Sequence, residues 1–214
     1  MLVTGELVRD VVASARRALV GFVVGGTLGI LMGYATGRNR LLDDSFGSLF
    51  QMLRPLPPIS LVPLLILWLG INEPAKYVLV SFGVFFPVWI NTHQGTRAVD
   101  PRYIWMAQSL GASRQKLAFE VILPAALPMI VSGLRTSIGV AFFCLVAAEL
   151  AGAMDGVVFR MNLSQLAFRV DRLIAGLLVL GSISLISDTL FVRFINVAFP
   201  WLNGPGNAHD AKSA

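Results

Sequence analysis

Residues 101–124 read PRYIWMAQSLGASRQKLAFEVILP and form a polar stretch between two strongly apolar segments. Asp100 before Pro101 is a helix-start signal, because an aspartate side chain can accept hydrogen bonds from free backbone N–H groups and proline fits the first helical position. Gly111 is expected to end this helix, since glycine lets the chain turn, and Ser113 is a plausible cap for a second helix. The sequence therefore predicts a compact unit of helix, glycine turn and helix.

The same stretch carries a family motif. Its order of Ala107, three residues, Gly111, nine residues, Val121, one residue, Leu123 and Pro124 resembles the Glu-Ala-Ala loop of the permease subunits of bacterial ATP-binding-cassette (ABC) importers. The resemblance implies a cytoplasmic coupling helix that sits in a groove of the ATPase subunit. The docking residues that it implies are Met106, Ala107, Gln108, Ser109, Gly111 and Ala112.

Two observations qualify this motif. Trp105 stands where the family most often has glutamate, so one docking contact differs from the usual pattern. A match to a short motif also allows a plainer interpretation, in which residues 101–124 are a structured loop between two membrane helices.

The composition indicates a membrane protein. Of the 214 residues, 56% are hydrophobic and only 14% are charged, and the mean hydropathy is +0.73, which is more apolar surface than one soluble core needs. The 17 lysines and arginines give a net charge of +5 but are scattered along loop ends, which is typical of membrane flanks and not of a nucleic-acid surface. The single cysteine, Cys144, lies in an apolar run and is expected to be a buried small residue.

Five transmembrane helices are predicted, which makes the chain an all-α membrane protein. Residues 18–37 carry no charge and at about 1.5 Å per residue span roughly 30 Å of hydrocarbon. Glycines recur along this segment at a spacing of four residues and predict close approach of another helix; they are Gly21, Gly25, Gly29 and Gly33. The other predicted spans cover residues 55–69, 77–91, 129–148 and 173–192.

The span at residues 55–69, PLPPISLVPLLILWL, is expected to be broken, because its prolines remove backbone donors. Irregular backbone at membrane depth is tolerated only where protein or a water-filled cavity surrounds it, so this segment is a candidate lining of a translocation path. The candidate lining residues are Pro57, Pro58, Ser60 and Pro63. A proline-kinked helix without a pore role is an equally good interpretation.

No active site is visible in the sequence, and neither a cofactor nor a metal site is predicted. The chain lacks a Gly-x-x-x-x-Gly-Lys-Ser/Thr phosphate loop, so ATP hydrolysis is expected in a partner subunit. His93 has no carboxylate beside it in sequence, and His209 lies in the polar tail. Arg135 and Glu149 fall at membrane depth, where an interfacial or interhelical role is favoured over substrate binding.

The resemblance extends over residues 6–201, which look like the permease subunits of the aliphatic sulfonate, taurine and nitrate importer group, most closely the aliphatic sulfonate type. The strings MLRPLPPISLVPLLILWLGI (52–71) and FPVWINTHQGTR (86–97) carry much of it. It implies one permease domain at 1–202 with the type I importer core, followed by a polar tail at 203–214. Family members usually have a further N-terminal transmembrane helix, so the reading frame starts upstream or this is a five-helix form.

The family resemblance also implies partners and a mechanism. The partners are ABC ATPase subunits, a periplasmic or lipid-anchored solute-binding protein and a second permease copy, all at the bacterial cytoplasmic (inner) membrane. The mechanism is alternating access driven by ATP. With residues 101–124 cytoplasmic, five spans place the N-terminus outside and the C-terminus inside. A secondary transporter, which would be expected to show inverted repeats, and a membrane scaffold remain as alternatives.

Overall fold

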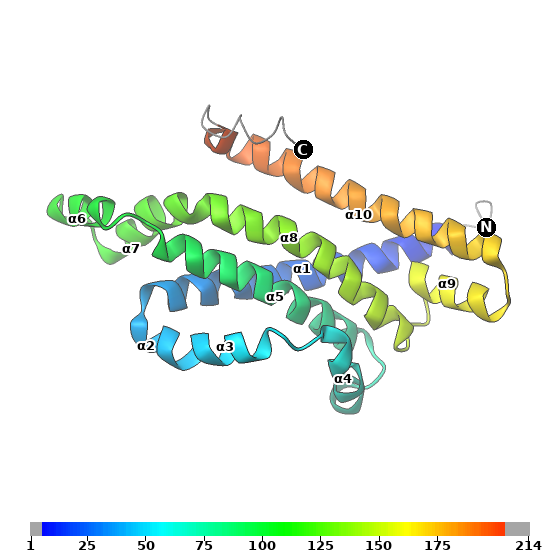
Figure 1. Cartoon of the computed structure of the whole chain (residues 1–214). Coiled ribbons are helices and arrows are strands. Elements are labelled where there is room, and N and C mark those ends of the chain that lie inside the picture. Colours follow the sequence, from blue (N-terminus) through cyan, green and yellow to red (C-terminus); the bar gives the residue numbers. More distant parts are fainter. Residues whose placement is uncertain (1–5, 204–214) are drawn as a thin grey trace.

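The computed structural model describes residues 6–203, and this part of the chain is helical with no strands (Figure 1). Its helices, in chain order, are α1 Glu6–Arg38, α2 Arg40–Leu42, the π-helix Asp43–Gly47, α3 Ser48–Leu53, the 3₁₀-helix Pro58–Leu61, α4 Val62–Leu69, α5 Glu73–Arg97, α6 Pro101–Ser109, α7 Arg114–Lys116, the π-helix Leu117–Ile122, α8 Leu123–Leu150, α9 Val157–Leu166, α10 Val170–Ala198 and the 3₁₀-helix Pro200–Asn203.

Four helical stretches are long and apolar enough to cross a membrane, and a bent pair of helices makes a fifth candidate. The four are α1, α5, the continuous helix Arg114–Leu150 and α10. The fifth is Arg40–Leu53 followed by Pro58–Leu69, whose two halves are bent by 93°. The predicted all-α membrane fold is therefore confirmed, and the predicted break near residues 55–58 lies between the two halves of the bent pair.

The glycine stripe of α1, whose spacing predicted close approach of another helix, packs against α5. A Cβ atom added to Gly29 would lie 2.8 Å from Cβ of Val88, and one added to Gly33 would lie 2.7 Å from the carbonyl oxygen of Trp89. Only glycine allows backbones to approach this closely. The resulting α1–α5 pair is completed by α8, and the shared core is formed by buried side chains that include Val80, Val84, Val88, Cys144 and Leu145.

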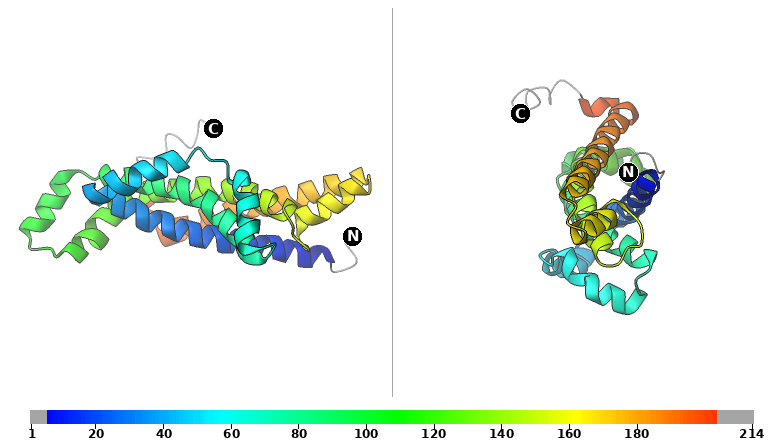
Figure 2. Two further views of the ribbon diagram at one scale, coloured as in Figure 1. Left: turned by 90° about the horizontal axis from the view of Figure 1, so that it is seen from below. Right: turned by 90° about the vertical axis from the view of Figure 1, so that its right-hand side faces the viewer.

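The three core helices run side by side along the long axis of the molecule (Figure 2). The α3–α4 segment covers one side of them and α10 lies on the other. α10 contributes only Ile195 to the buried residues, so most of its apolar surface is open to the surroundings. α6 lies at one end of the molecule, whereas the start of α1, α9 and the start of α10 lie at the opposite end (Figure 1).

Two helix boundaries differ from the prediction. α1 begins at Glu6 and not at residue 18, because the polar side chains of its first turns are buried against other helices. The helix that starts at Arg114 also continues without a break to Leu150. Pro124 does not end it; instead the residues before this proline widen into a π-helix, which accommodates a position that lacks a backbone donor.

Candidate functional site

α6 begins as the sequence predicted. The Asp100 carboxylate accepts a hydrogen bond from the backbone N–H of Arg102 at 2.9 Å and two from the Arg102 guanidinium, at 2.9 and 2.6 Å. These hydrogen bonds hold the pKa of Asp100 below its usual range. A carboxylate at the start of a helix also interacts favourably with the helix dipole.

The turn after α6 also follows the prediction. Gly111 has a φ of +77°, a conformation that other residues adopt only with strain. The backbone N–H of Ala112 donates to the carbonyl of Ala107 at 3.0 Å, which satisfies the end of the helix. The Ser113 hydroxyl then accepts from the N–H of Lys116 at 3.3 Å and caps the next helix.

One face of α6 is anchored to the membrane helices. Ile104 is buried and packs with Val99 and Ile122, and the half-buried Tyr34 and Leu117 surround this small cluster. The cluster joins α6 to the end of α1, to the α5–α6 connection and to the start of the long α8 helix. α6 is therefore in contact with segments that lead into three helices of the core.

The other face of α6 is exposed and contains large apolar side chains. Four of the six predicted docking residues are exposed; they are Met106, Gln108, Ser109 and Gly111. The remaining two, Ala107 and Ala112, are half-buried. The sequence prediction omitted neighbouring exposed residues on the same unit, namely Tyr103, Trp105 and Leu110, the last of which is 87% exposed. The sequence could have indicated these residues, since large apolar residues in a segment predicted to lie outside the bilayer are typical of a contact surface.

The proline-rich segment forms a sharp corner. The chain is extended at Pro57, and Ser60 donates its hydroxyl to the Pro57 carbonyl at 2.7 Å. Pro57, Ser60 and Pro63 are exposed and Pro58 is half-buried. All four predicted lining residues therefore lie together at one bend, with Pro57 just before the 3₁₀ turn, Pro58 and Ser60 on it, and Pro63 in the first turn of α4.

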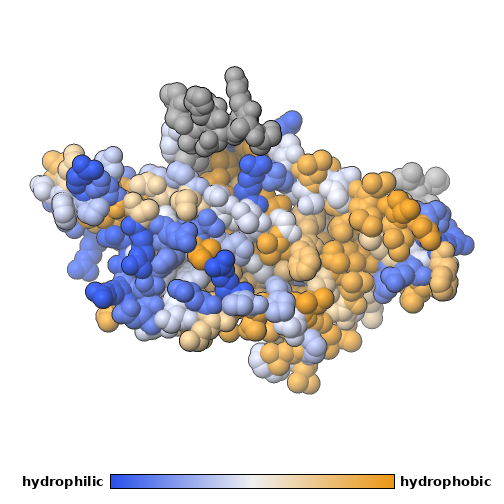
Figure 3. Space-filling view, viewed as in Figure 1, coloured by the Kyte–Doolittle hydropathy of each residue, from blue (hydrophilic) through white to orange (hydrophobic). Residues whose placement is uncertain are grey.

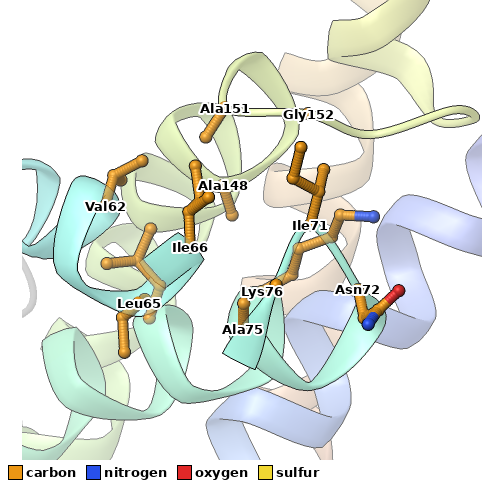
Figure 4. Close-up of a pocket in the computed structure, with 12 residues that line it drawn as sticks. Val62, Leu65, Ile66, Ile71, Asn72, Ala75, Lys76, Ala148, Ala151 and Gly152 are labelled. Atoms are coloured by element: carbon orange, nitrogen blue, oxygen red, sulfur yellow. The ribbon is translucent and has the colours of Figure 1, made fainter. Parts of the chain in front are cut away.

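α4 packs against the core helices away from α6 (Figure 1). Leu65 packs with Ala75 and Leu79 of α5 and with Ala147 and Ala148 of α8. Figure 4 shows the small pocket that remains between α4, the start of α5 and the end of α8. Its volume of about 20 Å³ is enough for one water molecule and too small for a transported solute.

A much larger cavity, of about 900 Å³, opens beside α3 and the second half of α5. Its lining combines basic and polar side chains with apolar ones; the basic and polar residues are Gln51, Arg54, His93, Gln94 and Arg97, and the others are Pro55, Trp89, Ile90 and Ala98. Arg97 donates to the carboxylate of Asp43 at 2.8 Å, and Nδ1 of His93 lies 3.0 Å from the Thr36 hydroxyl. Figure 3 shows hydrophilic side chains gathered on this half of the molecule, whereas the half near α9 and α10 is mainly apolar.

A buried ion cluster lies at the end of the bundle opposite α6. The Arg17 guanidinium of α1 is 1% exposed and pairs with three carboxylates: Glu73 at 2.6 Å, Glu149 at 3.0 Å, and Asp155. Lys76 donates to Glu73 at 2.7 Å. Such burial is tolerated because each charge faces an opposite one. Of the interfacial and interhelical roles expected for Glu149, the structure shows the interhelical one, since Glu149 joins α8 to Arg17 of α1.

The same cluster holds the start of α9. Three successive backbone N–H groups at this helix start each donate to a side chain of α1 or α8, at 2.9 to 3.1 Å; the pairs are Gly156 with Asp10, Val157 with Ser14, and Val158 with Glu149. These groups have no partner within the helix, so the contacts satisfy donors that would otherwise be buried without a bond. The ion cluster and these hydrogen bonds together join α1, α5, α8 and the start of α9 at this end of the bundle.

Sequence comparison identifies the family. Residues 25–198 match the family described as binding-protein-dependent transport system inner membrane component. The chain belongs to this family. A permease protein of Bacillus subtilis with the provisional name aliphatic sulfonates transport permease is 35% identical over 195 residues, which cover 91% of this chain and 70% of that protein. The taurine transport system permease protein of Escherichia coli is 34% identical over 189 residues, with coverage of 88% and 69%.

Solved structures of ABC transporters show the same permease fold. The crystal structure of an amino acid ABC transporter with histidines aligns with a TM-score of 0.63 at 15% identity and covers 91% of this chain and 92% of its own. An inward-facing methionine ABC transporter also gives a TM-score of 0.63, at 17% identity, with coverage of 88% and 95%. This permease therefore has the type I ABC importer core that the sequence predicted.

Proposed function

We propose that this permease imports a small anionic solute by ATP-driven alternating access and that α6 is its coupling helix. The observation that carries the proposal is the form of the 101–124 unit. It projects at one end of the bundle, presents exposed apolar residues such as Met106 and Leu110, and is anchored to the membrane helices through Ile104. A helix that is anchored on one face and apolar on the other is suited to a groove in a partner protein.

The connections of α6 support the coupling role. Three residues separate the end of α5 at Arg97 from Pro101, and four separate Ser109 from Arg114. Because both connections are short and Gly111 makes a tight turn, α6 cannot move far without moving α5 and the α7–α8 helix. Closure of two ATPase subunits would therefore shift the core helices that enclose the translocation path.

The large basic cavity supports an anion as the solute. Arg54, His93 and Arg97 line it, and glutamine side chains add hydrogen-bond donors. Relatives of this permease are named for aliphatic sulfonates, taurine and bicarbonate, and each of these solutes carries an oxyacid group that arginine can bind. The cavity lies beside Pro55 at the corner of the proline-rich segment, so Pro57, Pro58, Ser60 and Pro63 remain the proposed lining further along the path.

The proposed assembly contains two copies of this permease, two ABC ATPase subunits and a separate solute-binding protein in the bacterial inner membrane. The ATPase would bind at the α6 end. The solute-binding protein would then bind at the opposite end, where the ion cluster around Arg17 gives it a rigid surface.

Reconstituted transport tests this function. The permease is purified from its host with its associated subunits, placed in vesicles, and assayed for uptake of radiolabelled sulfonate, taurine, nitrate and bicarbonate. The proposal expects uptake that needs ATP, the ATPase and the solute-binding protein, and it expects Arg54→Gln to raise the KM. Uptake by the permease alone, driven by an ion gradient without ATP, would show a secondary transporter instead.

A further inference from the structure

A second, smaller cavity lies at the end of the molecule opposite α6. It has a volume of about 250 Å³ and is enclosed by the first residues of α1, by α9 and by the first turns of α10. Its walls are almost entirely apolar and include Leu7, Val157, Met161, Ala175, Leu178 and Val179. Gly176 contributes to its shape, because the lack of a Cβ lets the Met161 side chain lie directly against α10.

Two arginines also line this cavity. Arg160 is half-buried and is paired with Asp10. Arg172 is exposed, and within residues 6–203 it forms no hydrogen bond or ion pair. Because Arg160 is paired with Asp10, Arg172 is the lining cation whose charge is left for a ligand. An apolar cavity with an unpaired arginine fits an amphiphile whose head is an anion.

The position of the cavity along α10 matches a lipid. Arg172 is in the first turn of α10, and Val179 is seven residues further on, which is about 10 Å along the helix axis. The cavity therefore extends from the level of the headgroups towards the hydrocarbon core. The surface of α10 is apolar, with hydrophilic side chains near its start (Figure 3). An acyl chain can lie against this surface while its headgroup stays at the arginine.

We propose that this cavity binds a phospholipid with an acidic headgroup, of the phosphatidylglycerol kind. Its phosphate would accept hydrogen bonds from Arg172, and one acyl chain would lie along Ala175 and Leu178. A zwitterionic phospholipid binds more weakly, because its own cation faces a surface that is already positive. The bound lipid would fill the space between α1, α9 and α10 and hold α10 to the bundle at this end.

Native mass spectrometry of the full chain in detergent tests the proposal with phosphatidylglycerol and phosphatidylcholine of identical acyl chains. The wild type is expected to retain phosphatidylglycerol in preference to phosphatidylcholine. Arg172→Gln should weaken phosphatidylglycerol binding about tenfold, because a hydrogen bond to a charged group is lost. Ala175→Phe should reduce the binding of both lipids, since its ring occupies the groove.

Arg169→Gln is the matched control, because Arg169 is exposed beside the cavity but does not line it. It should leave lipid binding unchanged. The thermal midpoint of each variant, followed by labelling of the buried Cys144, shows that it is folded. Equal retention of the two lipids by the wild type overturns the proposal, as does an equal loss of phosphatidylglycerol in Arg169→Gln and Arg172→Gln.

Discussion

Removal of the Arg17 side chain should destabilise the permease strongly. In Arg17→Ala the carboxylate of Glu149, whose side chain is 0% exposed, loses its cationic partner. Removing one partner of a buried ion pair costs about 3–5 kcal/mol of unfolding free energy. For a chain of this size 1 kcal/mol lowers the Tm by about 2–4 °C, so the midpoint should fall by roughly 6–20 °C.

Arg16→Ala provides the comparison. Arg16 also pairs with Glu73, at 3.4 Å, but its side chain is 58% exposed. Exposed pairs contribute about 0–1 kcal/mol, so this variant should melt within a few degrees of the wild type. The double variant Arg17→Met with Glu149→Gln should recover much of the loss, because no unpaired buried charge remains.

The assay uses the single cysteine of the chain. Cys144 is completely buried in the core between α5 and α8, so a thiol-reactive dye reports its exposure as the protein unfolds in mild detergent. The account is refuted if Arg17→Ala and Arg16→Ala melt at the same temperature. It is also refuted if the double variant is less stable than Arg17→Ala, because the loss would then come from packing and not from charge.

Three other substitutions test separate parts of the structure. Gly33→Leu should force α1 away from α5 and lower the Tm in the same dye assay, whereas an unchanged Tm would contradict the close contact. Arg135→Gln leaves Asp188 of α10 without its cation inside a membrane span, where the open surface faces lipid and not water, so its Tm should fall more than that of Arg16→Ala, and a wild-type Tm would argue against this. Arg102 lowers the pKa of Asp100, so the stabilisation that the ionised Asp100 gives to α6 is complete above the ordinary aspartate pKa and is lost as the pH falls through the lowered pKa. ATPase binding by the wild type should therefore weaken over that acidic range. Asp100→Asn, which is a neutral cap, should remove this pH dependence of binding.

Features with a local cause were predictable from the sequence. The start of α6 needs only Asp100 and Pro101, and its end needs only Gly111, so neighbouring residues determine both. Close packing of a helix on α1 followed from the four-residue spacing of glycines such as Gly29 and Gly33, and the fold shows that this helix is α5. The break near residues 55–58 followed from prolines that lack backbone donors.

The ion cluster could not be predicted, because its members are far apart in sequence. Arg17 lies 56 residues from Glu73, 132 from Glu149 and 138 from Asp155. At the edge of an apolar segment an arginine is most often a membrane flank, and only the packing of α1 against α5 and α8 brings these carboxylates around it. The same packing explains why α1 begins at Glu6, twelve residues before the uncharged segment.

The exposed face of α6 was only partly predicted. The motif indicated Met106 and its neighbours and placed Trp105 at a docking position usually held by glutamate, but it gave no role to Tyr103 or Leu110, which the fold exposes on the same unit. The large basic cavity was also missed, because its lining comes from two segments, near residue 54 and residues 89–98, that become neighbours only in the fold.

The most direct test of the central claim compares ATPase binding by the wild type, Gly111→Trp and Gly139→Trp. Each tagged permease is purified in detergent from its host, and a bound partner is accepted only if it contains a phosphate loop and hydrolyses ATP. Gly111 lies in the proposed docking unit, whereas Gly139 has open space around it on α8, away from α6. The account predicts that the wild type and Gly139→Trp bind the ATPase and Gly111→Trp does not. Full ATPase binding by a folded Gly111→Trp permease, or none by the wild type, would contradict it.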